Sequence, residues 1–197
     1  NERIYIRNKQ VSNRYLLEVL EHVKYVNNNN AITFFEIITA ATFFMFSENI
    51  AELNILEVGL GGRFDATNVI NEKLACIIST IDYDHKEFLG NSIKSIATEK
   101  AGIIKKGSCV ISSMQKPTAK KIIQKKCRDT NTLLYEFNNH WRIEGKNFYY
   151  EDIIINFANL SLLGQHQYVN ASCALMTCLK IKELNINCLL YTSPSPR

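Results

Sequence analysis

Residues 74–81, LACIISTI, form a short apolar run rich in β-branched side chains, and the polar cluster DYDH follows at residues 82–85. A run of this kind is typical of a strand that is buried on both faces of a sheet. Three more apolar segments of strand length lie at 53–58, 109–112 and 133–135. Because such segments alternate with helical patterns, the sequence predicts an α/β fold in three layers, a mostly parallel sheet with helices on both faces.

The flanking segments predict other local structure. Ser12 is a candidate cap for a first helix, and Thr33 with Glu36 forms a capping-box pattern before an apolar helix over 34–47, which we expect to be deeply buried. The C-terminal part predicts a small antiparallel β element and a last helix. The remaining expected elements are a strand over 1–6, helices over 92–100, 117–128 and 168–184, and antiparallel strands over 141–144, 147–150 and 153–157.

Composition and charge limit the classes of function. Of 197 residues, 46% are hydrophobic and 21% are charged, which is ordinary for a globular protein. The 23 basic and 19 acidic residues give a net charge of +4, too small to argue for nucleic acid as a partner. The longest apolar stretch, residues 37–46, is too short to cross a membrane. Six cysteines without a C-x-x-C pair predict reduced core thiols in a cytoplasmic protein.

Two candidate ligands follow the ends of predicted strands. Glu57 lies near the end of segment 53–58, and His85 follows segment 74–81. Because neighbouring parallel strands bring their carboxyl ends together, the two side chains could hold a divalent cation. By ligand type alone, Zn²⁺ or Mn²⁺ suits the histidine better than Mg²⁺. Glu57 could instead be a buried acid paired with Arg63, and His85 an ordinary surface histidine.

Three further features carry less chemical information. The glycines of segment 59–62 lack the spacing of a dinucleotide-binding turn and better fit a tight backbone passage beside a ligand. Lys100 precedes a glycine exit from a helix, where a lysine ordinarily interacts with the helix dipole. The polar residues 164–170 open the last helix and could cap it or contact a ligand.

Together, several strings resemble the central ATP-binding domain of the Mur-ligase superfamily, and specifically the folylpolyglutamate synthase/dihydrofolate synthase family. They occur in the family's order and approximate spacing, and even NERI at residues 1–4 is similar to the corresponding family stretch. The strings are TFFE at 33–36, LEVGLGGRFDATN at 56–68, DHKEFLG at 84–90, EKAGIIK at 99–105 and LGQHQYVN at 163–170.

The resemblance implies a role for individual positions. Glu57 and His85 match Mg²⁺ ligands, and His85 with Lys100 belongs to the implied catalytic group. Lys100 matches a lysine that is carbamylated in relatives. Asn170, with His166 beside it, matches the residue that contacts the nucleotide. The positions that match the pocket for the pteroate part of the substrate are Thr33, Phe34, Phe35, Glu36, Phe64, Asp65 and Ala66.

The activity that the resemblance implies is ATP-driven amide ligation with ATP and Mg²⁺ as cofactors. ATP phosphorylates a carboxylate, and L-glutamate attacks the acyl phosphate, so that glutamate joins folate or dihydropteroate. The implied enzyme is a cytoplasmic monomer whose partners are these small molecules, with no nucleic acid and no membrane. The alternatives are another Mur-type amide ligase, for a peptidoglycan precursor or cyanophycin, or a non-catalytic folate- or nucleotide-binding module.

The sequence also departs from the family pattern. No G-x-x-x-x-G-K-[ST] phosphate loop occurs in it, and the family has this loop upstream of the position of Asn1. We therefore expect residues 1–188 to be an incomplete central domain, and the chain to be a fragment without the C-terminal ligase domain. Residues 189–197 contain two prolines and predict a linker or a non-native tail. On this expectation the chain alone does not turn over.

Overall fold

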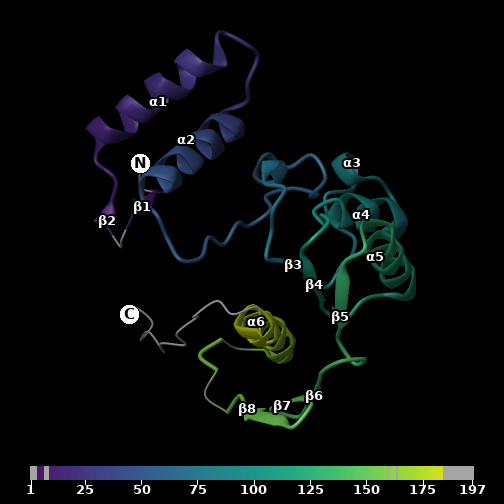
Figure 1. Cartoon of the computed structure of the whole chain (residues 1–197). Helices are drawn as coiled ribbons and strands as arrows, with labels where there is room; N and C mark the ends of the chain where they lie inside the picture. The colour runs from purple at the N-terminus through teal and green to yellow at the C-terminus, as the bar shows by residue number, and fades with distance from the viewer. Residues whose placement is uncertain (1–3, 7–8, 159, 163, 184–197) are drawn as a thin grey trace. The chain divides into compact units, whose positions relative to one another are not determined.

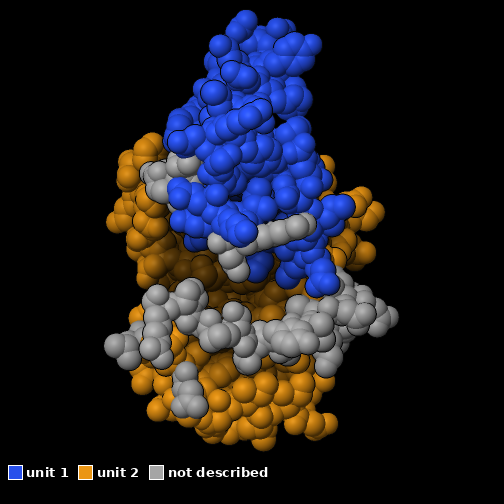
Figure 2. Space-filling view, turned by 90° about the vertical axis from the view of Figure 1, so that its left-hand side faces the viewer, with its two compact units in different colours: residues 1–58, 65–69 blue, residues 59–64, 70–197 orange. Residues whose placement is uncertain are grey.

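The structure, a computed structural model, describes residues 4–6, 9–158, 160–162 and 164–183. The chain divides into two compact units, which Figure 2 shows in different colours. Unit 1 comprises residues 1–58 and 65–69, and unit 2 comprises residues 59–64 and 70–197. Each unit encloses an apolar core of its own. Predictions for residues 1–3, for Cys188 and for the tail 189–197 lie outside the described residues.

Unit 1 is a pair of helices with a short antiparallel hairpin (Figure 1, purple and blue). Its elements are β1 (Tyr5–Ile6), β2 (Lys9–Gln10), α1 (Asn13–Asn27), α2 (Phe34–Glu48) and the 3-10 helix η1 (Ala66–Val69). The Ser12 hydroxyl caps α1 as predicted, accepting a hydrogen bond from the Tyr15 amide at 3.2 Å. The two helices bury a stripe that includes Val19, Val23 and Met45.

Helix α2 is less buried than its apolar sequence predicts. Only Ala41 and Met45 are fully buried, whereas 71% of Phe34 and 49% of Phe35 are exposed. Within unit 1, α2 packs mainly on α1 and η1. One helix and one short turn cover a single stripe of a helix surface, so the expectation of deep burial is wrong.

Segment 53–58 is not the strand that the sequence predicts. Residues 52–58 have no strand structure, Ile55 is 83% exposed, and Glu57 is exposed as well. A strand forms only where a neighbour takes up its backbone hydrogen bonds. Among the described residues, the parallel sheet consists of three strands and this segment pairs with none of them. The alternative of Glu57 as a buried acid is wrong for the same reason.

Unit 2 contains the predicted parallel sheet. Strands β3 (Ala75–Ile78), β4 (Cys109–Ser112) and β5 (Leu133–Glu136) lie in the order β3-β4-β5, all parallel, and the register places Ala75 opposite Cys109 and Cys109 opposite Leu133. The other elements of this unit are α3 (Lys86–Leu89), α4 (Ile93–Ala101), α5 (Pro117–Thr130), β6 (Arg142–Glu144), β7 (Asn147–Tyr150), β8 (Ile153–Asn156) and α6 (Gln165–Glu183).

Alternating side chains of the sheet enter two different cores. Val110 of β4 packs with residues of α4 and α5, including Ile96 and Ile123, on one face. The next residue, Ile111, packs on the opposite face with Trp141 and with residues of α6. This alternation gives the predicted three layers, with α4 and α5 on one face of the sheet and α6 on the other.

The antiparallel element is also confirmed. Strands β6, β7 and β8 form a three-stranded sheet in that order, and helix α6 contacts β6 as well as β3 and β4 (Figure 1, green and yellow). Trp141, 2% exposed, donates from Nε1 to the buried Ser172 hydroxyl on α6 at 3.1 Å. The five described cysteines are reduced thiols, and four of them are buried as expected. No helix among the described residues is long and apolar enough to span a membrane.

Candidate functional site

The glycine-rich loop 59–64 of unit 2 lies on the C-terminal end of helix α4. The Arg63 amide donates to the Glu99 carbonyl oxygen at 2.9 Å, and the Gly102 amide donates to the same oxygen at 3.1 Å. One carbonyl oxygen thus joins the loop to the last turn of α4. This contact brings together residues of the strings at 56–68 and 99–105, which are far apart in the chain.

Glycines permit this close approach. A Cβ added to Gly62 would lie 2.9 Å from the Glu99 carbonyl oxygen and 3.1 Å from that of Lys100, and Gly62 has a φ of +155°. A Cβ added to Gly102 would lie 2.4 Å from the Arg63 Cβ and 2.6 Å from its Cα. The tight backbone passage expected from the sequence is present, and it lies against the C-terminal end of α4.

Lys100 lies in the last turn of α4 and is half-buried. Two residues beyond it the helix ends at Gly102, and the next carbonyl oxygen, that of Ile103, accepts a hydrogen bond from Lys73 Nζ at 3.1 Å. Burial lowers the pKa of Lys73, because the charged ammonium loses water. The backbone around Lys100 is therefore held by the glycine-rich loop before the helix end and by Lys73 after it.

His85 follows β3 at the point where α3 begins. Its backbone is left-handed, with a φ of +45°, and its carbonyl oxygen accepts from the amides of Phe88 and Leu89 at 3.0 and 2.9 Å. Its Nε2 lies 3.4 Å from Asp84 Oδ2, and both side chains are substantially exposed. An imidazole nitrogen beside a carboxylate oxygen is a donor set suited to a divalent cation.

The structure assigns the two expected metal ligands to different units. Glu57 belongs to unit 1, whereas His85 and Lys100 belong to unit 2. Among the described residues, no three His, Cys, Asp or Glu side chains gather in a group that could hold a metal ion. Asp84 is the additional oxygen donor that sequence reasoning did not single out; its place directly before His85 was the available indication.

The segment expected to form a substrate pocket begins with a complete capping box. The Glu36 amide donates to Thr33 Oγ1 at 3.2 Å, and Glu36 Oε2 accepts from the amide and hydroxyl of Thr33 at 2.8 and 2.7 Å. The hydrogen bond from the Thr33 hydroxyl is the main cause that lowers the pKa of Glu36. These two polar side chains bind each other, which leaves the exposed rings of Phe34 and Phe35 as the surface at this helix start.

The other residues expected at this pocket lie around residues 64–67. Asp65 Oδ1 accepts from the amide and hydroxyl of Thr67 at 2.9 and 2.6 Å, which forms the turn that leads into η1 and places Ala66 at its start. Phe64 is 82% exposed, and the Arg63 guanidinium lies 4.9 Å from its ring centroid. Asp65 and Ala66 belong to unit 1, and Phe64 belongs to unit 2.

The expected nucleotide contacts lie in the first turns of α6. His166 and Asn170 are four residues apart, so they share a face of this helix, and both are exposed. Asn170 Nδ2 donates to Gln167 Oε1 at 3.1 Å. Gly164, with a φ of +111°, lies against the His166 ring, since an added Cβ would be 2.7 Å from Cε1.

Sequence reasoning identified the polar residues 82–85 after β3, but not that Lys116 from the start of α5 would join them. The Tyr83 ring lies 4.6 Å from Lys86 Nζ and 5.3 Å from Lys116 Nζ, as ring-centroid distances. Lys116 also bonds to Asp82 Oδ1 at 2.5 Å, and this hydrogen bond is the main cause that lowers the pKa of Asp82. Pro117 was the indication, because a proline in the first turn of a helix places the preceding lysine at the helix N-cap, in the connection after β4.

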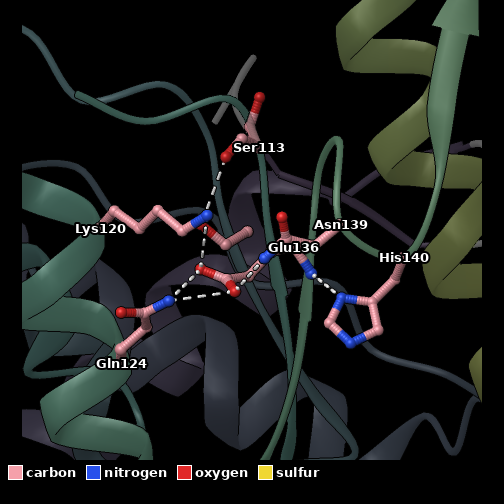
Figure 3. A network of polar contacts seen from close by, with 7 residues as sticks. Ser113, Lys120, Gln124, Glu136, Asn139 and His140 are labelled. Carbon is pink, nitrogen blue, oxygen red and sulfur yellow. Dashed lines mark hydrogen bonds and ion pairs between the residues drawn. The ribbon is translucent and has the colours of Figure 1, made fainter. Parts of the chain in front are cut away.

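A second polar cluster surrounds Glu136 at the end of β5 (Figure 3). Its carboxylate accepts from Gln124 Nε2 at 3.0 and 3.2 Å and from Asn139 Nδ2 at 2.9 Å, and Lys120 Nζ lies 3.8 Å away. The Glu136 amide donates to His140 Nδ1 at 3.0 Å. A hollow of about 420 Å³ beside it is lined by Gln124, Cys127, Arg128, Asn131, Thr132, Leu134 and Glu136. Side chains of this chain already bind the carboxylate. Because Gln124 and Lys120 belong to α5 and Glu136 belongs to β5, the cluster joins this helix to this strand.

Comparison with known proteins finds relatives of this chain. The dihydrofolate synthase/folylpolyglutamate synthase of Bacillus subtilis is 36% identical over 169 residues, which cover 78% of this chain and 38% of that protein. The folylpolyglutamate synthase of Lacticaseibacillus casei is 30% identical over 193 residues, covering 90% of this chain and 45% of that protein. A solved FPGS-AMPPCP-folate complex aligns with a TM-score of 0.82 and 27% identity, covering 94% of this chain and 49% of that chain.

The chain thus spans less than half the length of these relatives. Its α/β sheet with helices on both faces and its small antiparallel sheet match the architecture of the solved synthase. The family model of the Mur ligase middle domain matches residues 8–178, which includes both three-stranded sheets and most of α6. The chain belongs to the family of Mur ligase middle domains.

Proposed function

We propose that these residues are part of an ATP-dependent ligase that joins L-glutamate to folate or to dihydropteroate. The relatives are named for these two activities, and the aligned complex contains AMPPCP, an ATP analogue, and folate. The observation that carries the proposal is the contact between the Arg63 amide and the Glu99 carbonyl oxygen. It joins two of the strings that resemble the synthases into one structural element beside Lys100.

The reaction has two steps. A carboxylate oxygen of the pterin substrate attacks the γ-phosphorus of ATP, and ADP leaves, which gives an acyl phosphate. The amine of L-glutamate then attacks the acyl carbon, phosphate leaves with the bonding electrons, and the amine loses a proton as the amide forms. Phosphoryl transfer depends on aligning the reactants and neutralising charge, more than on covalent help from the protein.

We propose His85 and Glu57 as Mg²⁺ ligands, each on the resemblance of its own string. Beside His85, Asp84 Oδ2 lies 3.4 Å from its Nε2 and offers an oxygen donor, the ligand type that Mg²⁺ prefers. When bound, Mg²⁺ would supply positive charge that stabilises the phosphates in the transition state. Lys100 is proposed as the catalytic lysine, carbamylated as in relatives, so that its side chain acts as an anion instead of a cation.

The exposure of the expected side chains supports the proposed contacts with the substrate and the nucleotide. Phe34 and Phe35 present exposed rings that suit the flat faces of a pterin and a benzoyl group, and the mutual bonds of Thr33 and Glu36 fix the helix start that carries them. The exposed Phe64 ring, with Asp65 and Ala66 after it, is proposed as a pterin contact on the resemblance of its own string. His166 and Asn170 offer nitrogen and amide groups for the nucleotide from one face of α6.

We further propose a cytoplasmic monomer, whose reduced and mostly buried thiols support a reducing compartment. The division into an incomplete central domain over 1–188 and a tail over 189–197 stays a prediction.

An assay of the full-length protein that contains these residues tests the function. We expect ATP-dependent incorporation of labelled L-glutamate when tetrahydrofolate or dihydropteroate is supplied, with formation of ADP. A peptidoglycan precursor and cyanophycin serve as competing substrates. Ligation with one of these and with neither pterin would replace the folate assignment by another Mur-type ligase, and pterin binding without turnover would make the protein a binding module.

A single substitution tests Glu57 as a Mg²⁺ ligand. Glu57→Gln in the full-length protein should abolish turnover and leave the circular dichroism spectrum unchanged, because the amide keeps the shape and removes the charge that binds Mg²⁺. Glu52→Gln, in the same irregular and exposed segment, is the matched control and should keep normal rates. Near-normal rates in Glu57→Gln would remove Glu57 from the site.

A further inference from the structure

We propose that Gly102 is a positioning residue for the ligation reaction, because it allows loop 59–64 to lock onto the helix turn that carries Lys100. This inference rests on the proposed function for its catalytic consequence. Its structural part stands on contacts within unit 2 alone and can be measured without any activity.

We call the attachment of loop 59–64 to the end of α4 the lock. It has one hydrogen-bond acceptor and two donors. The Glu99 carbonyl oxygen, directly before Lys100, accepts from the Gly102 amide at 3.1 Å and from the Arg63 amide at 2.9 Å. A carbonyl oxygen in the last turn of a helix lacks the usual amide four residues further on, so an amide from another segment can bind it beside the Gly102 amide. The loop and the helix end are thereby tied at the residue next to the proposed catalytic lysine.

The conformation of Gly102 does not explain why a glycine is present. Its φ of −59° and ψ of −18° are right-handed helical values that any residue adopts, and alanine is the better helix former. A side chain at residue 102 does not fit, because the added Cβ would lie 2.4 Å from Arg63 Cβ and 2.6 Å from Arg63 Cα. One of these atoms is backbone, so rotating the arginine side chain does not relieve the contact.

Gly107 is the opposite case in the same part of the chain. Its φ is +86°, which side chains rarely adopt, but an added Cβ meets nothing within 4 Å. If glycine serves only backbone conformation, Gly107→Ala is harmful and Gly102→Ala is benign. If the lock positions Lys100, Gly102→Ala displaces the loop and Gly107→Ala leaves the loop in place.

The backbone that follows Lys100 is also held in place, so a substitution at Gly102 should displace only the atoms nearby. After Gly102 the Ile103 carbonyl oxygen accepts from Lys73 Nζ at 3.1 Å and from Cys76 Sγ at 3.3 Å, and both donors precede or belong to β3. Because β3 fixes this side, the strain of a larger residue at 102 moves the loop and the turn at Glu99 and Lys100. A shift of about 1 Å in a reacting group lowers the rate by roughly a hundredfold.

Amide hydrogen exchange in this chain tests the lock itself. In the unsubstituted protein the Arg63 and Gly102 amides should exchange at similar, slow rates, since both donate to one oxygen. In Gly102→Ala the Arg63 amide should exchange at least about tenfold faster, and in Gly107→Ala it should keep its original rate. Rapid exchange of Arg63 in the unsubstituted protein would overturn the proposal, and that measurement requires no variant to fold.

Kinetics of the full-length protein test the catalytic consequence. Gly102→Ala should lower kcat by about a hundredfold with little change in KM for ATP and for the pterin, because the reacting groups are misaligned while binding surfaces remain. Gly107→Ala should keep the original kcat. A normal kcat with an accelerated Arg63 amide would refute the positioning role, whereas absent ligation by the unsubstituted protein would instead contradict the proposed function.

Discussion

At the scale of single residues, polar side chains that resemble substrate contacts are also structural. Thr33 and Glu36 were predicted as a capping box from their spacing alone, and the structure confirms both hydrogen bonds. The exposure of Phe34 and Phe35 could not be predicted, because an apolar helix sequence does not tell how many neighbours will cover it. Local spacing fixes caps; burial depends on partners elsewhere in the chain.

Removing the Thr33 hydroxyl should show both effects of the cap. Thr33→Ala should lower the free energy of unfolding by about 1 kcal/mol, measured by chemical denaturation. The pKa of the Glu36 carboxyl should rise toward its usual value, measured by NMR titration, because the donor that stabilises the carboxylate is lost. Thr33→Ser keeps a hydroxyl and is the control; an unchanged Glu36 pKa in Thr33→Ala would contradict the hydrogen-bond assignment.

The sign of the associated pH dependence follows from that lowered pKa. A carboxyl whose pKa is lower in the folded state contributes stability above its unfolded pKa and loses it as the pH falls through the folded pKa. Thr33→Ala should therefore lose less stability between neutral and acidic pH than the unsubstituted protein. An identical acid dependence of the two proteins in denaturation curves would show that Glu36 gains nothing from Thr33.

At the scale of elements, helix α6 is attached to the antiparallel sheet by polar contacts inside an apolar core. Trp141 donates to Ser172, which in turn donates to the Val169 carbonyl oxygen at 2.7 Å. Lys180, buried on the same helix, bonds to the Tyr150 hydroxyl and lies 4.4 Å from the Tyr135 ring centroid. These contacts orient the helix whose first turns carry His166 and Asn170.

Trp141→Phe should weaken this attachment. The variant removes the donor to a hydroxyl that is fully buried and leaves space where the larger ring packed, so we expect a loss of about 2 kcal/mol in the free energy of unfolding. Ile154→Val, at a position that is 65% exposed on β8, is a control and should change stability little. Equal unfolding midpoints for the two variants in thermal melts would contradict this account.

The success of sequence reasoning also differs between elements. The apolar run at 109–112 predicted β4 correctly, and the helical pattern over 92–100 predicted α4 to within one residue. The equally apolar run at 53–58 forms no strand, because pairing is a property of two segments and one of them gives no information about the other. For the same reason the strings at 56–68 and 99–105 predicted candidate residues, but not that Gly102 and Arg63 would touch.

At the scale of the whole molecule, the chain covers less than half of its relatives and contains no phosphate-loop pattern. We therefore expect the isolated chain to show no ATP-dependent ligation of glutamate to tetrahydrofolate or dihydropteroate, measured as labelled product with the full-length protein as the positive control. Ligation by the purified chain at a rate above background would mean that these residues align and activate both substrates by themselves.

The buried thiols allow the unfolding of unit 2 to be followed by alkylation and mass spectrometry. Cys76, Cys109, Cys127 and Cys173 are buried in β3, β4, α5 and α6, so each reports on a different part of unit 2. Burial raises the pKa of the Cys127 and Cys173 thiols, which keeps the reactive thiolate scarce while these helices are folded. An alkylating reagent added during denaturation would label each cysteine as its surroundings open, and the order of labelled peptides would give the order in which the layers come apart.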